Sequence, residues 1–371
     1  MVNKNPYAPC FLCPRRCGAD RGQAGSPALL SETGNPAGRP GQCGEGAALR
    51  LAFAGIHRGE EPPLTGGPEG GGSGAVFVSG CNLGCVFCQN RQLSGSQNAR
   101  RAGGGTLGRP VDAAEFARIC LALQERGAEN INIVTGSHAV PALVEGIAAA
   151  RSGQAGFPGR LTVPVLWNSS AYELPETLEF LAGQADVFLP DLKTLDRAAA
   201  ARYFHAPDYP EIAPAAIEKM LSLRPLRFAG APAADPQAGI AAETAVNAAG
   251  QARLVSGVLI RHLVLPGCLP ASRAVLRWFA DHCAGRALLS VMFQYTPVGP
   301  AGPGYPPGGP RRTVSGEEYE TVLGWLEEFS IEDGYCQELV SGNLPLPDFN
   351  RPGPFPAGLA VPVWHWRTGF V

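Results

Sequence analysis

The chain has 371 residues, of which 45% are hydrophobic and 17% are charged, and its formal net charge is −2. This length predicts one large domain or a domain with appendages, and the apolar content allows a sizeable buried core. The weak net charge argues against non-specific binding to nucleic acid or to an anionic membrane, because both require a basic surface. An RNA or DNA substrate is therefore disfavoured.

The sequence shows no sign of a membrane segment or of export. A transmembrane helix needs about 18 uninterrupted apolar residues, and no such run occurs. The N-terminus MVNKNPYAPCFLCPRRC lacks the apolar stretch of a secretory signal. We therefore expect a cytoplasmic protein in which the 11 cysteines stay reduced, so that clustered cysteines indicate metal binding more than disulfides.

From residue 75 onward, β-type and helical segments alternate. Apolar runs predict strands over 75–79, 130–135, 162–168, 186–193, 258–266 and 287–295. Helices are expected after them, over 112–126, from Pro141 onward, over 174–181, in one or two pieces through about 223, over 272–283 and over 317–329. The first helix has Asp112 as a candidate N-cap and Gly127 just beyond its end.

Six such β/α units predict an α/β fold in which helices cover a parallel sheet. The sheet could be open and doubly wound, or it could curl into a barrel, and periodicity does not separate the two. In both cases the loops at the carboxyl ends of the strands form the active face.

Three cysteines follow the first strand directly, in the sequence Cys81-Asn-Leu-Gly-Cys85-Val-Phe-Cys88. Structural zinc usually takes four ligands, and no fourth cysteine lies near this loop in the sequence. Three thiolates can instead hold three corners of a [4Fe–4S] cluster and leave the fourth iron open to a substrate. The spacing favours this cluster over zinc and over plain buried thiols.

The C-x3-C-x2-C spacing, with Phe87 before its last cysteine, is the radical S-adenosylmethionine (SAM) signature. Around it the chain resembles the pyruvate formate-lyase-activating-enzyme-like branch (glycyl radical enzyme activases) of that superfamily, in the segments HRGEEPPLTG (57–66), SGCNLGCVFCQN (79–90), INIVTGSHA (131–139), VFLPDLKT (187–194) and RHLVLPG (261–267). The resemblance implies a partial (β/α)6 TIM-type barrel of the radical SAM type. It also implies a [4Fe–4S] cluster on Cys81, Cys85 and Cys88, with SAM bound at the open iron.

The resemblance further implies SAM contacts at the other strand ends. The turn Thr135-Gly136-Ser137-His138 stands where the family has a Gly-Gly-Glu form, and an ordinary βα turn is the alternative. Gly136 would allow a close approach of the backbone. For the serines at a strand end, the alternative to SAM binding is capping of a helix. For Asp191 and Lys193, the alternative is an ion pair at the protein surface. The expected SAM-binding residues are Gly136, Ser137, Asn168, Ser170, Asp191, Lys193 and Arg261.

Four further cysteines precede the first of these strands: Cys10, Cys13, Cys17 and Cys43. Four thiolates could complete a zinc site or a second iron–sulfur cluster, and unligated thiols are the alternative. A role in electron relay is a hypothesis motivated only by the number of cysteines.

We expect three parts: a cysteine-containing N-terminal extension (1–74), a radical SAM core (75–330) and a proline-rich C-terminal tail (331–371). The resemblance implies an oxidoreductase that cleaves SAM reductively to a 5′-deoxyadenosyl radical, so that the cluster and SAM carry the chemistry without a catalytic side chain. The radical would abstract hydrogen from a glycine of a partner protein, with flavodoxin or ferredoxin as reductant. The alternatives are radical modification of a small molecule or RNA, and a metal-binding scaffold without turnover.

Overall fold

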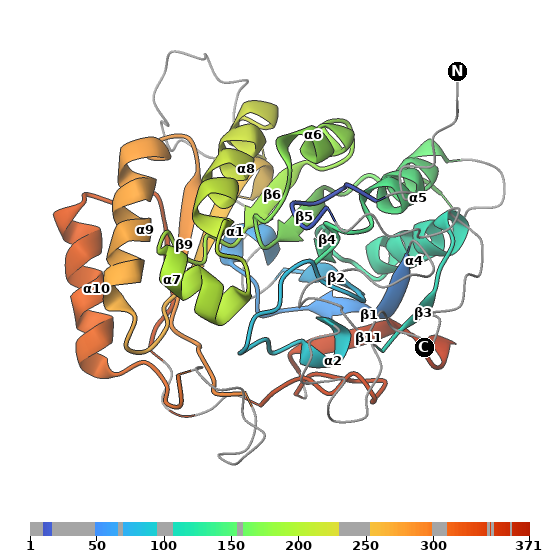
Figure 1. Cartoon of the computed structure of the whole chain (residues 1–371). Helices are drawn as coiled ribbons and strands as arrows, with labels where there is room; N and C mark the ends of the chain where they lie inside the picture. Colours follow the sequence, from blue (N-terminus) through green and yellow to red (C-terminus); the bar gives the residue numbers. More distant parts are fainter. Residues whose placement is uncertain are drawn as a thin grey trace.

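The computed structural model describes residues 10–16, 49–65, 70–94, 107–153, 159–229, 253–298, 310–339, 342, 345–356 and 358–371. The strands in these ranges are β1 (Arg50–His57), β2 (Ser73–Val78), β3 (Arg109–Pro110), β4 (Ile131–Val134), β5 (Val165–Ser169), β6 (Val187–Pro190), β7 (Arg227–Phe228), β8 (Leu254–Leu263), β9 (Leu288–Met292), β10 (Gly334–Cys336), β11 (Ala360–His365) and β12 (Gly369–Phe370). They form one sheet in the order β10-β9-β8-β6-β5-β4-β2-β1-β11-β12, with β3 and β7 at its margins. Across the described residues the sheet does not close, which is the arrangement of a partial barrel, and the predicted α/β fold is confirmed (Figure 1).

The six predicted strands are β2, β4, β5, β6, β8 and β9, and each pairs in parallel with its neighbour in this series. The sheet also continues beyond them. β1 pairs antiparallel with both β2 and β11, so strands from the expected extension and tail belong to the same sheet as the core. β1 escapes pattern analysis because all six of its central residues are buried, which removes the polar–apolar alternation of a half-buried strand.

The helices are α1 (Pro62–Thr65), α2 (Arg91–Ser94), α4 (Ala113–Glu125), α5 (Val140–Ser152), α6 (Pro175–Leu178), α7 (Arg197–Ala199), α8 (Tyr209–Leu223), α9 (Leu269–His282) and α10 (Gly316–Glu328). A 3-10 turn, η1 (Glu179–Leu181), follows α6, and a π-helical turn, η2 (Ala200–Phe204), follows α7. The predicted ends of α4 are confirmed, since Asp112 accepts the Glu115 N–H at 2.7 Å and Gly127 has φ +89°. None of the described helices is long and apolar enough to cross a membrane.

The two faces of the sheet bury different partners. Val76, Ile133 and Trp167 point outward into a large core shared with the helices, which surround the sheet in Figure 1. Alternate residues such as Leu166, Leu189 and Leu259 point to the inner face, where Leu64 of α1 joins them. Because side chains alternate along a strand, the position two residues after each inner leucine also faces inward. This alternation determines to which face of the sheet the strand-end side chains of the candidate site point.

Candidate cofactor site at the cysteine loop

The three cysteines lie on the loop between β2 and α2, here called the cysteine loop (residues 81–88), at the carboxyl edge of the parallel strands. Gly80 directly precedes the loop with φ +100°, and a Cβ there would lie 2.7 Å from His138 Nε2, so the position requires glycine. That nitrogen also lies 2.9 Å from the Ser79 carbonyl, to which it donates. His138, which the sequence leaves unassigned, therefore supports the entry to the loop.

The π-helical turn η2 supports the loop from the other side. The Val86 N–H donates to the Tyr203 carbonyl at 2.9 Å, and the Gly84 N–H donates to the Phe204 carbonyl at 3.3 Å. The Phe87 ring packs against Tyr203 and Phe204 with centroid distances of 6.4 and 5.7 Å, and against Tyr295 at 5.5 Å. Phe87 is buried, so the aromatic residue of the cysteine motif fixes the loop backbone between the cysteines.

The electrostatics of the loop fit a shared metal cofactor. Burial raises the pKa of Cys81, and the nearby Cys85 and Cys88 raise it further. Burial likewise raises the pKa of Cys85 to about 12, while the Lys193 cation acts in the opposite direction. Three thiols that disfavour one another's ionisation become thiolates readily when an iron–sulfur cluster supplies compensating positive charge. The donor set and its charge environment therefore fit the cluster implied by the resemblance.

Asp191 and Lys193 form an ion pair beside this loop. Lys193 Nζ lies 2.7 Å from Asp191 Oδ2. Burial lowers the pKa of Lys193, but Asp191 and then Cys85 outweigh it and hold the pKa above its ordinary value, so the side chain is a cation. The Tyr209 hydroxyl, not foreseen from the sequence, contacts the Asp191 carbonyl at 2.5 Å and accepts the Lys193 N–H at 3.1 Å. The two residues lie together at the strand end, and their contact with SAM stays a prediction.

Asn168 and Arg261 occupy inner-facing positions of β5 and β8, and Ser170 directly follows β5 with its carbonyl 2.8 Å from the Tyr209 hydroxyl. The Arg261 backbone forms a parallel β-bridge with the Asp191 backbone. The Arg261 Nε donates to Glu61 Oε1 at 2.9 Å, and its Nη2 contacts both Glu60 and Glu61. The guanidinium thus contacts two carboxylates of the β1–α1 connection. Both lie in the segment HRGEEPPLTG, and the sequence by itself predicts no role for either of them.

Gly136 and Ser137 point to the outer layer. A Cβ on Gly136 would lie 2.7 Å from both Leu143 and Trp167, so helix–sheet packing by itself requires the glycine. Ser137 is buried and donates to Glu173, which also accepts from Trp167 Nε1 at 2.8 Å and from Ser169 Oγ at 2.6 Å. Thr135, with φ +65°, interrupts the alternation just before this turn. The structure therefore assigns these two positions packing and hydrogen-bonding partners within the protein, and their predicted SAM contacts stay predictions.

We expect Gly136→Ala to destabilise the fold by about 1–3 kcal/mol, because the added methyl overpacks the contact between Leu143 and Trp167. Urea unfolding followed by circular dichroism measures the change. Gly324→Ala in α10 is the matched control: nothing lies within 4 Å of its Cβ, and it should raise stability by up to about 1 kcal/mol. Equal effects of the two substitutions would contradict the packing explanation.

The N-terminal segment 10–16 contacts the cysteine loop through Arg15. Its Nε donates to the Asn82 carbonyl at 2.8 Å and its Nη1 to the His205 carbonyl at 2.7 Å, while the guanidinium lies 5.1 Å from the Tyr172 ring centroid. Cys10 and Cys13 are buried, and Cys17 and Cys43 lie outside the described residues. In the part of the chain that is described, no three His, Cys, Asp or Glu side chains form a group suited to a single metal ion. The second metal site stays a prediction.

Arg15→Ala should loosen the cysteine loop, since it removes two charge-assisted hydrogen bonds to backbone carbonyls. In anaerobically reconstituted protein we expect iron loss to a chelator to become about fivefold faster or more. Arg15→Lys should rescue this only in part, because an ammonium does not reproduce the planar fork. The exposed neighbour Arg16→Ala is the control, and iron loss that is as fast in this variant would refute the role of Arg15.

Comparison with known proteins finds a family model that matches part of this chain. Residues 75–223 match the family model described as the radical SAM superfamily. An uncharacterised protein of Methanocaldococcus jannaschii is 25% identical over 331 residues, which cover 89% of this chain and 78% of that protein.

Two solved structures are similar at low sequence identity. A radical SAM methyltransferase from Sphaerobacter thermophilus is 12% identical with a TM-score of 0.44, over 77% of this chain and 70% of the other. SuiB from Streptococcus suis, in a structure with bound S-adenosylmethionine, is 10% identical with a TM-score of 0.41, over 70% of this chain. The chain covers 48% of SuiB, about half its length.

The matched segment contains the cysteine loop, Phe87, the turn after β4 and the Asp191–Lys193 pair. The family match and the site geometry coincide over the same residues. The chain is therefore similar to the radical SAM superfamily over residues 75–223.

Proposed function

We propose that the protein is a radical SAM oxidoreductase in which Cys81, Cys85 and Cys88 hold a [4Fe–4S] cluster. The observation that carries the proposal is the convergence of three mutually interacting thiols on one loop, at the strand edge where the half-buried Lys193 cation interacts with them. Held by these three residues, such a cluster would supply the electron for reductive cleavage of SAM to methionine and a 5′-deoxyadenosyl radical.

The residues around the loop have separable tasks in this proposal. Lys193 stabilises thiolate charge, as its effect on the pKa of Cys85 indicates, and Asp191 keeps Lys193 protonated. Tyr209 joins the ends of β5 and β6 through the Ser170 and Asp191 carbonyls, and so fixes the geometry of this edge. Asn168 is partly exposed on the inner face, and its amide can donate to or accept from a polar ligand such as SAM.

We further propose that the radical abstracts hydrogen from a glycine of a partner protein. Support comes from the resemblance to activating enzymes in the segments 57–66, 79–90 and 187–194, and from a sheet that leaves its two edges unjoined in the described residues. Modification of a small molecule or RNA by the same cofactor is the competing function.

Anaerobic reconstitution with iron and sulfide, followed by reduction with dithionite in the presence of SAM, tests the first proposal. We expect 5′-deoxyadenosine and methionine in equal amounts. Metal binding without SAM cleavage would favour the scaffold interpretation and refute the enzyme. Incubation with candidate glycyl radical enzymes, followed by electron paramagnetic resonance, tests the second proposal through the doublet of a glycyl radical.

A further inference from the structure

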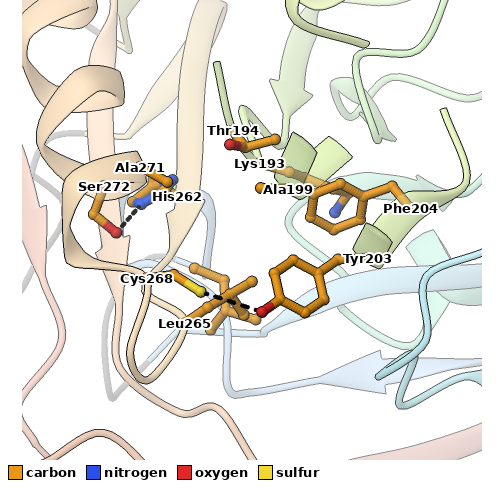
Figure 2. A pocket seen from close by; sticks show the side chains of 11 residues that line it. Lys193, Thr194, Ala199, Tyr203, Phe204, His262, Leu265, Cys268, Ala271 and Ser272 are labelled. Atoms are coloured by element: carbon orange, nitrogen blue, oxygen red, sulfur yellow. Dashed lines mark hydrogen bonds between the residues drawn. The ribbon is translucent and has the colours of Figure 1, made fainter. Parts of the chain in front are cut away.

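The middle and the end of the cysteine loop are held by different elements. The carbonyls of Tyr203 and Phe204 bind its middle, and Figure 2 shows the side chains of both residues lining a small cavity together with Lys193. The end of the loop at Cys88 depends instead on α2, which begins three residues later. The two supports come from separate parts of the chain, so each can be changed without the other.

Helix α2 contacts both ends of the cysteine loop. The Leu93 carbonyl accepts the N–H of Gly80, directly before the loop, at 2.7 Å. At the other end, the Ser94 hydroxyl and the Asn90 N–H both donate to the Cys88 sulfur. Hydrogen bonds to the ligand sulfurs are among the factors that set the reduction potential of an iron–sulfur cluster. The position of α2 therefore bears on the cluster as well as on the loop.

Helix α2 is in turn bound by the C-terminal part of the chain. Gln92 Nε2 donates to Asp348 Oδ1 at 3.0 Å, and Gln92 Oε1 accepts the Phe349 N–H at 2.7 Å. One carboxamide thus makes two hydrogen bonds to residues that are 256 and 257 positions away. These three residues are here called the tail latch, and Figure 1 shows the red segment before β11 passing beside α2.

The tail latch is anchored where it meets α2. Phe349 is buried, and its ring centroid lies 5.2 Å from that of Phe77 on β2. Its carbonyl accepts from His365 Nε2 at 3.1 Å and from Trp366 Nε1 at 2.9 Å. Leu93 of α2 belongs to the same apolar cluster as Phe349 and Phe77. A fixed part of the fold, and not a loose chain end, therefore holds α2.

We propose that Gln92 and Asp348 are positioning residues that raise the reduction potential of the cluster by holding α2 against the cysteine loop. The inference rests on the proposed function, because it concerns the cluster on the three cysteines of the loop. With α2 in place, the Asn90 and Ser94 donors stay on the Cys88 sulfur and stabilise the more negative, reduced state of the cluster. Without the latch, α2 moves away from the loop and this stabilisation is weakened. The alternative is that the latch only anchors the tail.

A redox titration of the reconstituted holoenzyme, followed by electron paramagnetic resonance of the reduced cluster, separates the two explanations. In Gln92→Ala and in Asp348→Ala we expect a lower reduction potential than in the unsubstituted protein. A latch that only anchors the tail would lower the yield of holoenzyme but would leave the potential of the clusters that form unchanged. In the same variants without the cluster, amide hydrogen exchange over residues 80–94 should become about tenfold faster, because α2 has lost two hydrogen bonds.

A rescue experiment exchanges the donor and the acceptor of the latch at constant net charge. Gln92→Glu alone places two carboxylates side by side and should lower the potential at least as much as Gln92→Ala. Addition of Asp348→Asn gives the new carboxylate an amide donor again. The double variant should therefore recover most of the lost potential, which a double-mutant cycle measures.

Gln124→Ala is the matched control. Gln124 also joins two segments through its carboxamide, since Oε1 accepts the Thr162 N–H at 2.7 Å and Nε2 donates to the Arg160 carbonyl at 3.0 Å. These contacts lie just before the beginning of β5, whereas the cysteine loop lies at the carboxyl edge of the strands. The potential of this variant should equal that of the unsubstituted protein.

Three outcomes would overturn the positioning role: an unchanged or higher potential in Gln92→Ala and Asp348→Ala, a shift of the same size in Gln124→Ala, or no recovery in the double variant. Failure of the proposed function has a different signature. The unsubstituted protein would then show no [4Fe–4S] signal at all, whereas the faster hydrogen exchange of the latch variants would persist.

Discussion

Cys85→Ala should abolish SAM cleavage and bring the iron content of the reconstituted protein close to zero. Cys85 lies between the other two ligands in sequence, on the loop held by the Tyr203 and Phe204 carbonyls. Two thiols cannot replace three, because a second corner of the cluster would then lack a protein ligand. Iron and sulfide analysis, the visible absorption of the cluster and the yield of 5′-deoxyadenosine measure the effect.

Cys336→Ala is the matched control, since Cys336 is an exposed free cysteine at the edge strand β10. It should keep the full iron content and rate. The cluster assignment to Cys85 would be falsified if the Cys85 variant retained iron and cleaved SAM at the unsubstituted rate.

Arg261→Ala should cost about 3–5 kcal/mol of unfolding free energy, because it leaves two carboxylates buried without their cation. The side chains of Arg261, Glu60 and Glu61 are only 10%, 14% and 11% exposed. Urea unfolding at pH 7 measures the loss. An unchanged m-value would show that the variant and the unsubstituted protein expose a similar amount of surface on unfolding. Arg273→Ala breaks an ion pair whose side chains are 48% and 44% exposed, and should cost less than about 1 kcal/mol.

The loss in Arg261→Ala should also depend on pH. Burial tends to raise the pKa of Glu61, but Arg261 outweighs it and holds the pKa below the ordinary value of 4.5. A folded-state pKa below the unfolded one stabilises the protein above about pH 4.5, and this contribution is lost as the pH falls through the folded value. Without Arg261, burial should raise the pKa of Glu61, and acidification then favours the folded variant.

The stability gap between the two proteins should therefore narrow from pH 7 to pH 4. A gap that is constant with pH, or as small as that of Arg273→Ala, would show that the carboxylates do not depend on Arg261. The contact with SAM would then be the better account of this residue.

The sequence predicts the parallel core of the fold well because its strands are continuous apolar runs bounded by loops. It also places the cysteines correctly at the edge of the sheet, since Cys81 follows β2 by three residues. The Asp191–Lys193 contact follows from the alternation of an extended segment. These features depend on neighbours in sequence, and local pattern is sufficient for them.

Contacts between segments that are far apart in the chain cannot be predicted from local sequence patterns. Glu61 and Arg261 are 200 positions apart, and nothing in either segment identifies the other as its partner. Arg15 reaches His205 across 190 positions for the same reason. Gly136 and Ser137 turn outward because Thr135 adopts a left-handed conformation that a single sequence does not reveal.

The short helix α1 packs on the inner face of the sheet, at one end of it. Leu64 packs among Leu166, Val187, Leu254 and Leu288, which stand near the beginnings of their strands. The Leu64 carbonyl also accepts from Asn130, one residue before β4. Helix α1 thus covers the inner face of the sheet at the end where these strands begin. A target of the proposed radical would then approach the cysteine loop from the opposite end, where the strands have their carboxyl ends.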